Sequence, residues 1–252
     1  MPEADVELVA DVRAALHAEA EPERAVGAQR YMKSPMPFLG VRLPIVRGLV
    51  RTAEHARPLR SRTVLVATVR ELWSKAEYRE ERYAATELLN TTSARRLRSM
   101  ELLPLYRELI VSGAWWDHVD EVAQRVAELR TNFPAEMDPV LRDWSTETDM
   151  WLRRTAIISQ LRAKQATDLD LLTDVIEPNL ADREFFIRKA IGWALRDYAW
   201  TDPGWVREYV TVHGTQLSPL SRREALKNVA PRRPAPRRTP RPRRGPHSPA
   251  QR

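Results

Sequence analysis

The chain has 252 residues, no cysteine and a formal net charge of +7 at neutral pH. The lack of cysteine excludes disulfides and thiolate metal sites, and it fits a reducing compartment. Residues 231–252 alone hold eight arginines and no acidic residue, which leaves the first 230 residues with a net charge of about −1. A basic surface on that part of the chain therefore has to be a local patch.

Composition divides the chain into a folded domain over residues 1–230 and a disordered basic tail over residues 231–252. The tail contains seven prolines and no large apolar residue, so it cannot bury enough surface to offset the entropy lost on ordering. The acidic N-terminus lacks the pattern of a secretion signal, and no run of about 18 apolar residues occurs. We expect a soluble, cytoplasmic and monomeric protein without a membrane partner.

Apolar residues recur with the period of a helix almost throughout residues 4–229. No segment bounded by turn residues shows the alternation of apolar and polar residues that is typical of a strand. We predict about twelve or thirteen helices. The expected spans are Asp5–Glu19, Glu21–Lys33, Leu43–Ala56, Arg62–Lys75, Tyr78–Thr91, Met100–Val111, Trp115–Arg130, Ala135–Trp144, Met150–Lys164, Leu169–Pro178, Glu184–Trp200, Pro203–Val212 and Ser218–Val229. The helices recur in pairs at roughly 35 to 40 residues, as in stacked helical hairpins of the HEAT type. The predicted fold is an all-α, HEAT-like helical-repeat solenoid whose concave face is the natural binding surface.

A loop framed by Pro37 and Pro44 follows the helix that ends in Tyr31-Met32-Lys33. The two prolines fix the chain at both ends of a turn, and Gly40 between them permits that turn. As a connector, this segment needs no further function.

The segment Trp-Trp-Asp-His-Val-Asp, which begins at Trp115, sorts onto two faces of a helix. Trp115 starts an apolar stripe of valines, whereas Trp116 and Asp120 lie about 100° away from that stripe. Only Ala123 and Ala127 follow on this second face. A large aromatic residue beside a carboxylate, next to small side chains, indicates a concave site.

Two later segments leave alternatives open. Arg153 and Arg154 both lie off the core side of their helix, and periodicity does not say which one faces the groove. Trp193 lies off the buried stripe of its helix, where packing against the next repeat is the simpler interpretation. Gly192 beside it costs about 0.8 to 1 kcal/mol in a helix interior, which close approach of another backbone or a ligand would explain.

Together these segments resemble the AlkD-like family of DNA alkylation-repair glycosylases, which are helical-repeat enzymes that remove alkylated purines. The resemblance extends from about Ala25 to Val229 and rests on several motifs in the same order. These motifs are Tyr31–Lys33, Pro37–Val41, Trp115–Asp120, Trp151–Ile157, Glu184–Arg196 and Leu220–Ala225.

The resemblance implies roles for five residues. Trp116 and Trp193 would hold the deoxyribose and backbone of the lesion, and Asp120 would be the catalytic carboxylate. Arg154 would be the arginine that contacts phosphate, and Tyr31 an aromatic contact on the opposite wall of the cleft. No metal ion and no cofactor are expected.

The implied chemistry suits these residue types. Alkylation at N3 or N7 makes a purine a cationic leaving group, so what remains is to stabilise an oxocarbenium-like sugar, as one carboxylate does in glycoside hydrolysis. An ionised Asp120 would do this and would position the attacking water. No activated lysine nucleophile is apparent, so we expect hydrolysis without strand cleavage.

Duplex DNA containing alkylated purines is the expected partner. The candidate phosphate contacts on the concave face are Lys33, Arg154, Arg188, Lys189, Arg222 and Arg223. They have to lie on one side to bind DNA at physiological salt, and the tail would add sequence-independent attraction. The competing interpretation is a non-catalytic repeat scaffold for nucleic acid or a protein, in which the two tryptophans anchor an interface.

Overall fold

The computed structural model describes residues 3–229, and this part of the chain is helical without strands. Its α-helices are α1 (Val6–Ala18), α2 (Pro22–Met32), α3 (Leu43–Ala56), α4 (Arg62–Ser74), α5 (Arg79–Leu88), α6 (Thr92–Arg96), α7 (Leu103–Gly113), α8 (Trp116–Asn132), α9 (Pro134–Ser145), α10 (Met150–Ile158), α11 (Leu169–Ile176), α12 (Phe185–Tyr198), α13 (Pro203–Val212) and α14 (Pro219–Ala225). Short 3-10 segments are η1 (Met100–Leu102), η2 (Lys164–Ala166), η3 (Glu177–Asn179) and η4 (Leu226–Asn228). No helix in this range is both long and apolar enough to cross a bilayer. The tail predicted at 231–252 lies outside the described residues.

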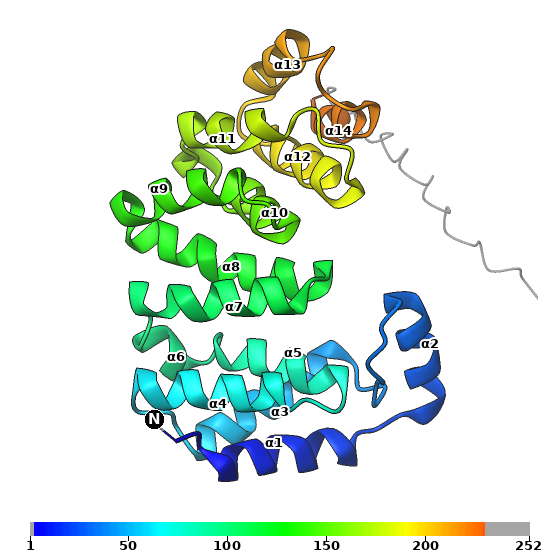
Figure 1. Cartoon of the computed structure of the whole chain (residues 1–252), viewed down its shortest axis with the longest axis vertical. Helices are drawn as coiled ribbons and strands as arrows, with labels where there is room; N and C mark the ends of the chain where they lie inside the picture. Colours follow the sequence, from blue (N-terminus) through cyan, green and yellow to red (C-terminus); the bar gives the residue numbers. More distant parts are fainter. Residues whose placement is uncertain (1–2, 230–252) are drawn as a thin grey trace, which may run out of the picture.

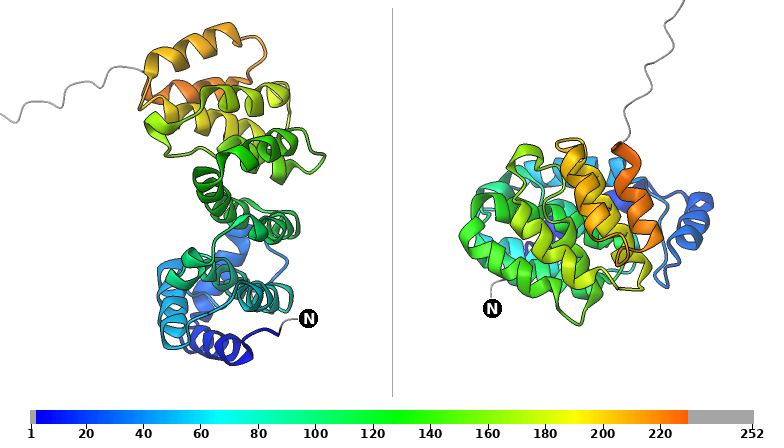
Figure 2. Two further views of the ribbon diagram at one scale, coloured as in Figure 1. Left: turned by 90° about the vertical axis from the view of Figure 1, so that its left-hand side faces the viewer. Right: turned by 90° about the horizontal axis from the view of Figure 1, so that it is seen from above.

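The helices stack in pairs that follow one another in chain order along the long axis (Figures 1 and 2). The second helices of the pairs are α3, α5, α8, α10, α12 and α14, and each contacts the next one. We call this continuous row of helices the inner layer. The first helices α1, α4, α7 and α9 each pack on the second helix of their own pair. The predicted all-α helical-repeat fold is confirmed.

One cluster of buried apolar side chains runs through the stack from Leu8 to Val229. Each pair buries its apolar surface against its neighbours, so the chain needs no single central core. The valine stripe predicted for α8 is fully buried at Val119, Val122 and Val126. Trp115 itself precedes the helix with an extended backbone, and its ring packs on Phe186 with a centroid distance of 5.5 Å.

Helix α2 stands beside the stack and not within it (Figure 1). Met32 is its only buried residue, and a backbone bond of 2.9 Å from Glu21 to Leu39 ties its start to the following loop. Gly40 in that loop has φ +88°, and a Cβ there would lie 2.2 Å from the Glu21 carbonyl oxygen. The turn therefore requires glycine, as predicted. The fully buried Glu80 accepts the backbone N–H groups of Leu39 and Gly40 at 2.9 and 2.8 Å.

The structure differs from the predicted helices most clearly at the end of α10 and at α6. The helix predicted over Met150–Lys164 ends at Ile158, because Gln160 bonds the backbone of Asp168 in both directions and Asp197 accepts the Arg162 N–H at 2.7 Å. The short α6 was not predicted, since five residues are too few to show a helical period. Its start is capped by Thr91.

Ser218 caps the start of the last helix, α14, because its Oγ accepts the Ser221 N–H at 3.0 Å. Helix α14 crosses α12 so closely that a Cβ on Gly192 would lie 2.5 Å from the Cβ of Glu224 and 3.1 Å from the Ser221 carbonyl oxygen. Close approach of another backbone is therefore the reason for this glycine, one of the two explanations given above.

We expect Gly192→Ala to lower the free energy of unfolding by about 1–2 kcal/mol, because the clash outweighs the better helix propensity of alanine. Gly48→Ala in α3 is the matched control, since a Cβ there meets nothing within 4 Å. That change should stabilise the protein by about 0.5–1 kcal/mol. Urea unfolding followed by circular dichroism measures both, and equal stabilisation by the two substitutions would contradict the close approach of α14.

Candidate active site

Helix α8 begins abruptly after a sharp turn. Ala114 has a left-handed backbone with φ 39°, Trp115 is extended, and the helix starts at Trp116. Asp117 lies in the first turn, where its negative charge favours the positive end of the helix dipole. Asp120 follows Trp116 by one helical turn, so both side chains leave the same side of α8.

Asp120 forms a two-pronged ion pair with Arg154 of α10. Nε donates to Oδ1 at 2.8 Å and Nη2 donates to Oδ2 at 2.7 Å. The remaining guanidinium nitrogen, Nη1, donates to the Phe186 carbonyl oxygen at 2.7 Å. The Arg154 side chain is 5% exposed and that of Asp120 is 18% exposed, so the carboxylate remains accessible from the surface while the arginine lies behind it.

Trp193 of α12 joins this pair. Its ring centroid lies 6.0 Å from the Arg154 guanidinium carbon, and Trp193 and Asp120 line the same small hollow of about 70 Å³. Ala123 and Ala127 line that hollow as well, as expected from the helix face they share with Asp120. Three helices of the inner layer, α8, α10 and α12, therefore contribute side chains to one small concave site.

Burial raises the pKa of the Asp120 carboxyl, although the hydrogen bonds and charge of Arg154 oppose the shift. Because the pKa is raised, the cost of desolvating the carboxylate exceeds the stabilisation that Arg154 gives it. The carboxylate is therefore an acceptor whose charge is less well stabilised than that of an aspartate in water.

A second carboxylate–arginine pair holds the first turn of α8 from the other side. Arg79 of α5 donates to both oxygens of Asp117 at 3.0 and 2.7 Å, and the Tyr83 hydroxyl donates to the same carboxylate at 2.6 Å. Arg79 also donates to Ser34 Oγ at 3.2 Å, and its backbone N–H donates to the Pro37 carbonyl. Burial disfavours ionisation here too, but the bonds from Arg79 hold the pKa of Asp117 below its ordinary value.

His118 is fully buried beside this pair, with its ring against Trp73 and Tyr83. Neither ring nitrogen has a hydrogen-bond partner among the described residues, and burial lowers the pKa of the imidazole to about 3. The imidazole is therefore neutral at physiological pH and serves as packing. No cluster of acids and histidines in residues 3–229 is arranged to hold a metal ion.

Helix α2 borders a separate hollow of about 530 Å³ that Tyr31, Phe38 and Tyr83 line. Tyr31 is 76% exposed. Through the bond from Tyr83 to Asp117, this hollow adjoins the first turn of α8. Lys33 caps α2 with a left-handed backbone and is exposed.

The other predicted cations have different surroundings. Arg222 and Arg223 are exposed on α14. Lys189 lies 3.4 Å from Glu224, a carboxylate that also accepts from Arg196 at 2.5 Å. Arg188 is partly buried, and its Nε has no partner among the described residues.

Comparisons with known proteins identify the family of the chain. The sequence profile of a family described as DNA alkylation repair enzyme matches residues 12–229. The chain belongs to the DNA alkylation repair enzyme family. A solved structure described as a predicted DNA alkylation repair enzyme from Enterococcus faecalis is 30% identical, with a TM-score of 0.73. The match covers 83% of this chain and 96% of that one, whereas no curated protein matches.

This family member has site residues that sequence reasoning missed. Arg79, Tyr83 and the Phe186 carbonyl each hold a residue of the site, yet no local pattern distinguishes them. The one available signal was Asp117, an acid in the motif to which no role had been given. A carboxylate in the first turn of a half-buried helix needs a partner, but the sequence does not say which arginine supplies it.

We expect Arg79→Gln to destabilise this repair protein by about 3 kcal/mol, because it leaves the Asp117 carboxylate buried without its partner. Adding Asp117→Asn should recover part of that loss, with a coupling energy of about 1–3 kcal/mol in the double-mutant cycle. Urea unfolding gives the free energies of unfolding of the four proteins in the cycle, which are the unchanged chain, the two single variants and the double variant.

The exposed pair Arg70 and Glu108, at 2.7 Å, is the matched control. The same cycle there with glutamine substitutions should give less than about 1 kcal/mol. Equal coupling energies at the two pairs would show that burial does not strengthen the Arg79 pair.

Proposed function

We propose that this chain is a monofunctional DNA glycosylase that hydrolyses the N-glycosidic bond of cationic N3- or N7-alkylated purines in duplex DNA. The observation that carries the proposal is the partly exposed Asp120 carboxylate, held by a buried arginine beside the Trp193 ring. Membership of the DNA alkylation repair enzyme family supports the substrate class.

In the proposed reaction, the bond between C1′ and the purine nitrogen breaks first. Its electron pair goes to the purine, which neutralises the alkylated base and lets it leave without a general acid. Positive charge develops on the sugar, where the Asp120 carboxylate stabilises it electrostatically. A water molecule then adds to C1′ and loses its proton, which Asp120 can accept.

The two tryptophans would contribute through their ring faces. Trp116 leaves α8 one turn before Asp120, and Trp193 faces the Arg154–Asp120 pair. An indole beside a cationic sugar adds about 0.5–2 kcal/mol of attraction. Because this attraction and that of Asp120 depend on positive charge, neutral lesions should be poor substrates.

DNA would lie along the inner layer, between α2 beside the stack and α14 near its C-terminal end (Figure 1). Tyr31 lies in α2 and Lys33 caps that helix, Arg222 and Arg223 lie in α14, and none of these side chains is buried. Arg154, Arg188 and Lys189 lie between them. No lysine among the described residues accompanies Asp120 in its hollow, so we propose hydrolysis without strand cleavage.

The test is single-turnover release of base from duplex DNA that carries one N7-methylguanine. Asp120→Asn should lower the rate by about 10²-fold or more, because it removes the charge that stabilises the transition state. DNA affinity, measured by fluorescence anisotropy, should stay within about two-fold. The matched control is Asp170→Asn, an exposed acid on α11, which should change neither quantity.

Tight binding of this duplex and of an N3-methyladenine duplex, with no release from either, would replace the glycosylase with a non-catalytic scaffold. Release that survives Asp120→Asn would leave the activity in place but remove this carboxylate from it.

The rate should also depend on pH through Asp120. The ionised carboxylate is the active form and burial raises its pKa, so the rate falls as pH is lowered through a value above the ordinary 3.8 of an aspartate. Arg154→Gln removes the charge that opposes the shift, so the acid limb of the pH–rate profile should move to higher pH. Arg153→Gln is the control, because Arg153 pairs with Asp182. Identical acid limbs in all three proteins would contradict the role of Arg154.

A further inference from the structure

Arg162 is an exposed cation beside Asp120, and the proposed reaction gives it no role. It lines the hollow of about 70 Å³ together with Asp120, Gln124 and Trp193. Its guanidinium makes no hydrogen bond or ion pair with any residue in the range 3–229. Arg154 differs, because it is paired with Asp120 and only 5% of its side chain is exposed. Of these two arginines, Arg162 is the one whose N–H groups are open to a ligand.

The backbone of Arg162 has an unusual conformation for an arginine. Its φ is 69°, in the left-handed region, and Lys164 two positions later has φ 54°. Side chains with a Cβ rarely adopt this conformation, because the Cβ crowds the backbone. Such strain persists only where the surrounding structure holds it, and it gathers at functional sites.

Hydrogen bonds from two directions hold the loop that carries Arg162. Asp197 of α12 accepts the Arg162 N–H at 2.7 Å. At the other side, Gln160 bonds the backbone of Asp168 in both directions, at 2.9 and 2.8 Å. Asp197 follows Trp193 by one helical turn, so the helix that carries this tryptophan also fixes the arginine beside it. The backbone of Arg162 is therefore positioned at the hollow without any ligand.

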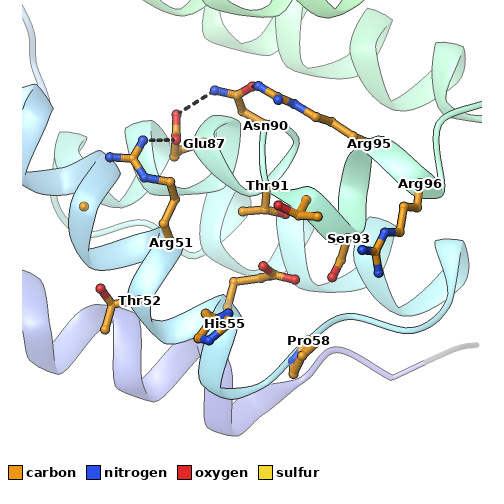
Figure 3. Close-up of a pocket in the computed structure, with 13 residues that line it drawn as sticks. Arg51, Thr52, His55, Pro58, Glu87, Asn90, Thr91, Ser93, Arg95 and Arg96 are labelled. Carbon is orange, nitrogen blue, oxygen red and sulfur yellow. Dashed lines mark hydrogen bonds and ion pairs between the residues drawn. The ribbon is translucent and has the colours of Figure 1, made fainter.

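The cations of another hollow, of about 980 Å³ between α3, the end of α5 and α6, do not converge (Figure 3). The Arg95 guanidinium turns to Asn90, to which it donates at 2.8 Å, and the Arg96 guanidinium points away from it. That hollow offers no shared site for an anion. Arg162, in contrast, lies at a hollow that is also lined by an indole and a carboxylate.

The neighbours of Arg162 indicate which anion it would bind. A guanidinium binds phosphate oxygens through paired N–H groups. In the proposed function the sugar of the lesion lies against Asp120 and Trp193, and each sugar within a DNA strand is bonded to a phosphate on either side. A phosphate of the lesion strand would therefore reach the rim of the same hollow. A free anion has no such link to the site, and the Asp120 carboxylate would repel it.

We propose that Arg162 binds a backbone phosphate next to the lesion and so seats the sugar of the lesion against Asp120. This inference rests on the proposed function, which places the sugar in this hollow. Its test measures binding and not base release, so a failure of the glycosylase and a failure of the Arg162 contact give different results.

The test is fluorescence anisotropy of the full chain with a duplex that carries one tetrahydrofuran residue, a stable analogue of a sugar without its base. Arg162→Gln should weaken binding by about five-fold or more, because a charged donor to phosphate is lost. The slope of log affinity against log salt should fall in magnitude by about one, the value for a single phosphate. Arg207→Gln, on an exposed position of α13, is the matched control and should change neither quantity.

Neutral methylphosphonate linkages show which phosphate is bound. Replacing the phosphate on one side of the tetrahydrofuran residue should weaken binding of the unchanged chain about as much as Arg162→Gln does. With Arg162→Gln, the same replacement should have no further effect, because the two changes remove one and the same contact.

Arg162→Gly separates the contact from the fold. Glycine is the residue that a left-handed backbone favours, so this variant should unfold at the same or a higher urea concentration than the unchanged chain. It should nevertheless bind the duplex as weakly as Arg162→Gln. Asp197→Ala removes the bond that holds the loop, so it should weaken binding in the unchanged chain but not in Arg162→Gln.

Two results would overturn the proposal. The first is an affinity and a salt slope of Arg162→Gln equal to those of Arg207→Gln. The second is a loss of affinity in Arg162→Gln that no methylphosphonate next to the tetrahydrofuran residue reproduces, which would place the contact away from the lesion. Base release that is absent while the binding results hold would count against the glycosylase and support the phosphate contact.

Discussion

Two buried arginines hold the start of α8 from opposite sides, and the geometry of the candidate site depends on them. Arg79 of α5 binds Asp117 and Arg154 of α10 binds Asp120, each through two hydrogen bonds of 3.0 Å or less. Both pairs are largely shielded from solvent. A buried charge that loses its partner costs several kcal/mol, so neither α5 nor α10 can shift against α8 without breaking a pair. The orientation of the first two turns of α8 is fixed in this way.

Ion pairs between repeats are common along this stack, but most contribute little to its stability. Arg70–Glu108, Arg107–Glu147 and Arg142–Asp174 each join residues 32 to 40 positions apart. The arginines of these pairs have side chains 42–49% exposed, and such surface pairs contribute about 0–1 kcal/mol each. The Arg79–Asp117 and Arg154–Asp120 pairs differ from these surface pairs in their burial, and this burial is why they matter for the geometry of the site. The apolar cluster holds the repeats together along the whole stack. The two buried pairs fix how α5, α8 and α10 are positioned against one another.

The parts of the molecule that the sequence predicted are those that local periodicity determines. The bounds of α3 and α13 agree with the predicted spans, and the alanines below Asp120 line its hollow because one helix carries all of them. Features that depend on a distant residue were missed. The helix predicted up to Lys164 ends early because the residues after Ile158 bind elsewhere: Asp197 accepts the N–H of Arg162, 35 positions away. Arg79 likewise binds Asp117 across 38 positions. Arg154 was assigned to phosphate through a family resemblance, whereas its pairing with Asp120 required the folded arrangement of three helices.

That pairing raises the question of how, in the proposed reaction, one arginine could hold the Asp120 carboxylate and also contact DNA. A guanidinium has five N–H groups, and Arg154 uses three of them on Asp120 and the Phe186 carbonyl. Two N–H groups remain, so a phosphate oxygen that reached them would not require the release of Asp120, although only 5% of the arginine side chain is open to it. A phosphate at that position would share the positive charge of the arginine and so leave more of the Asp120 charge for the developing sugar cation. Lysine could not serve both partners, because its compact ammonium has three donors and no planar fork. In the proposed reaction, an arginine at this position therefore makes the strength of the catalytic carboxylate depend on the presence of the DNA backbone.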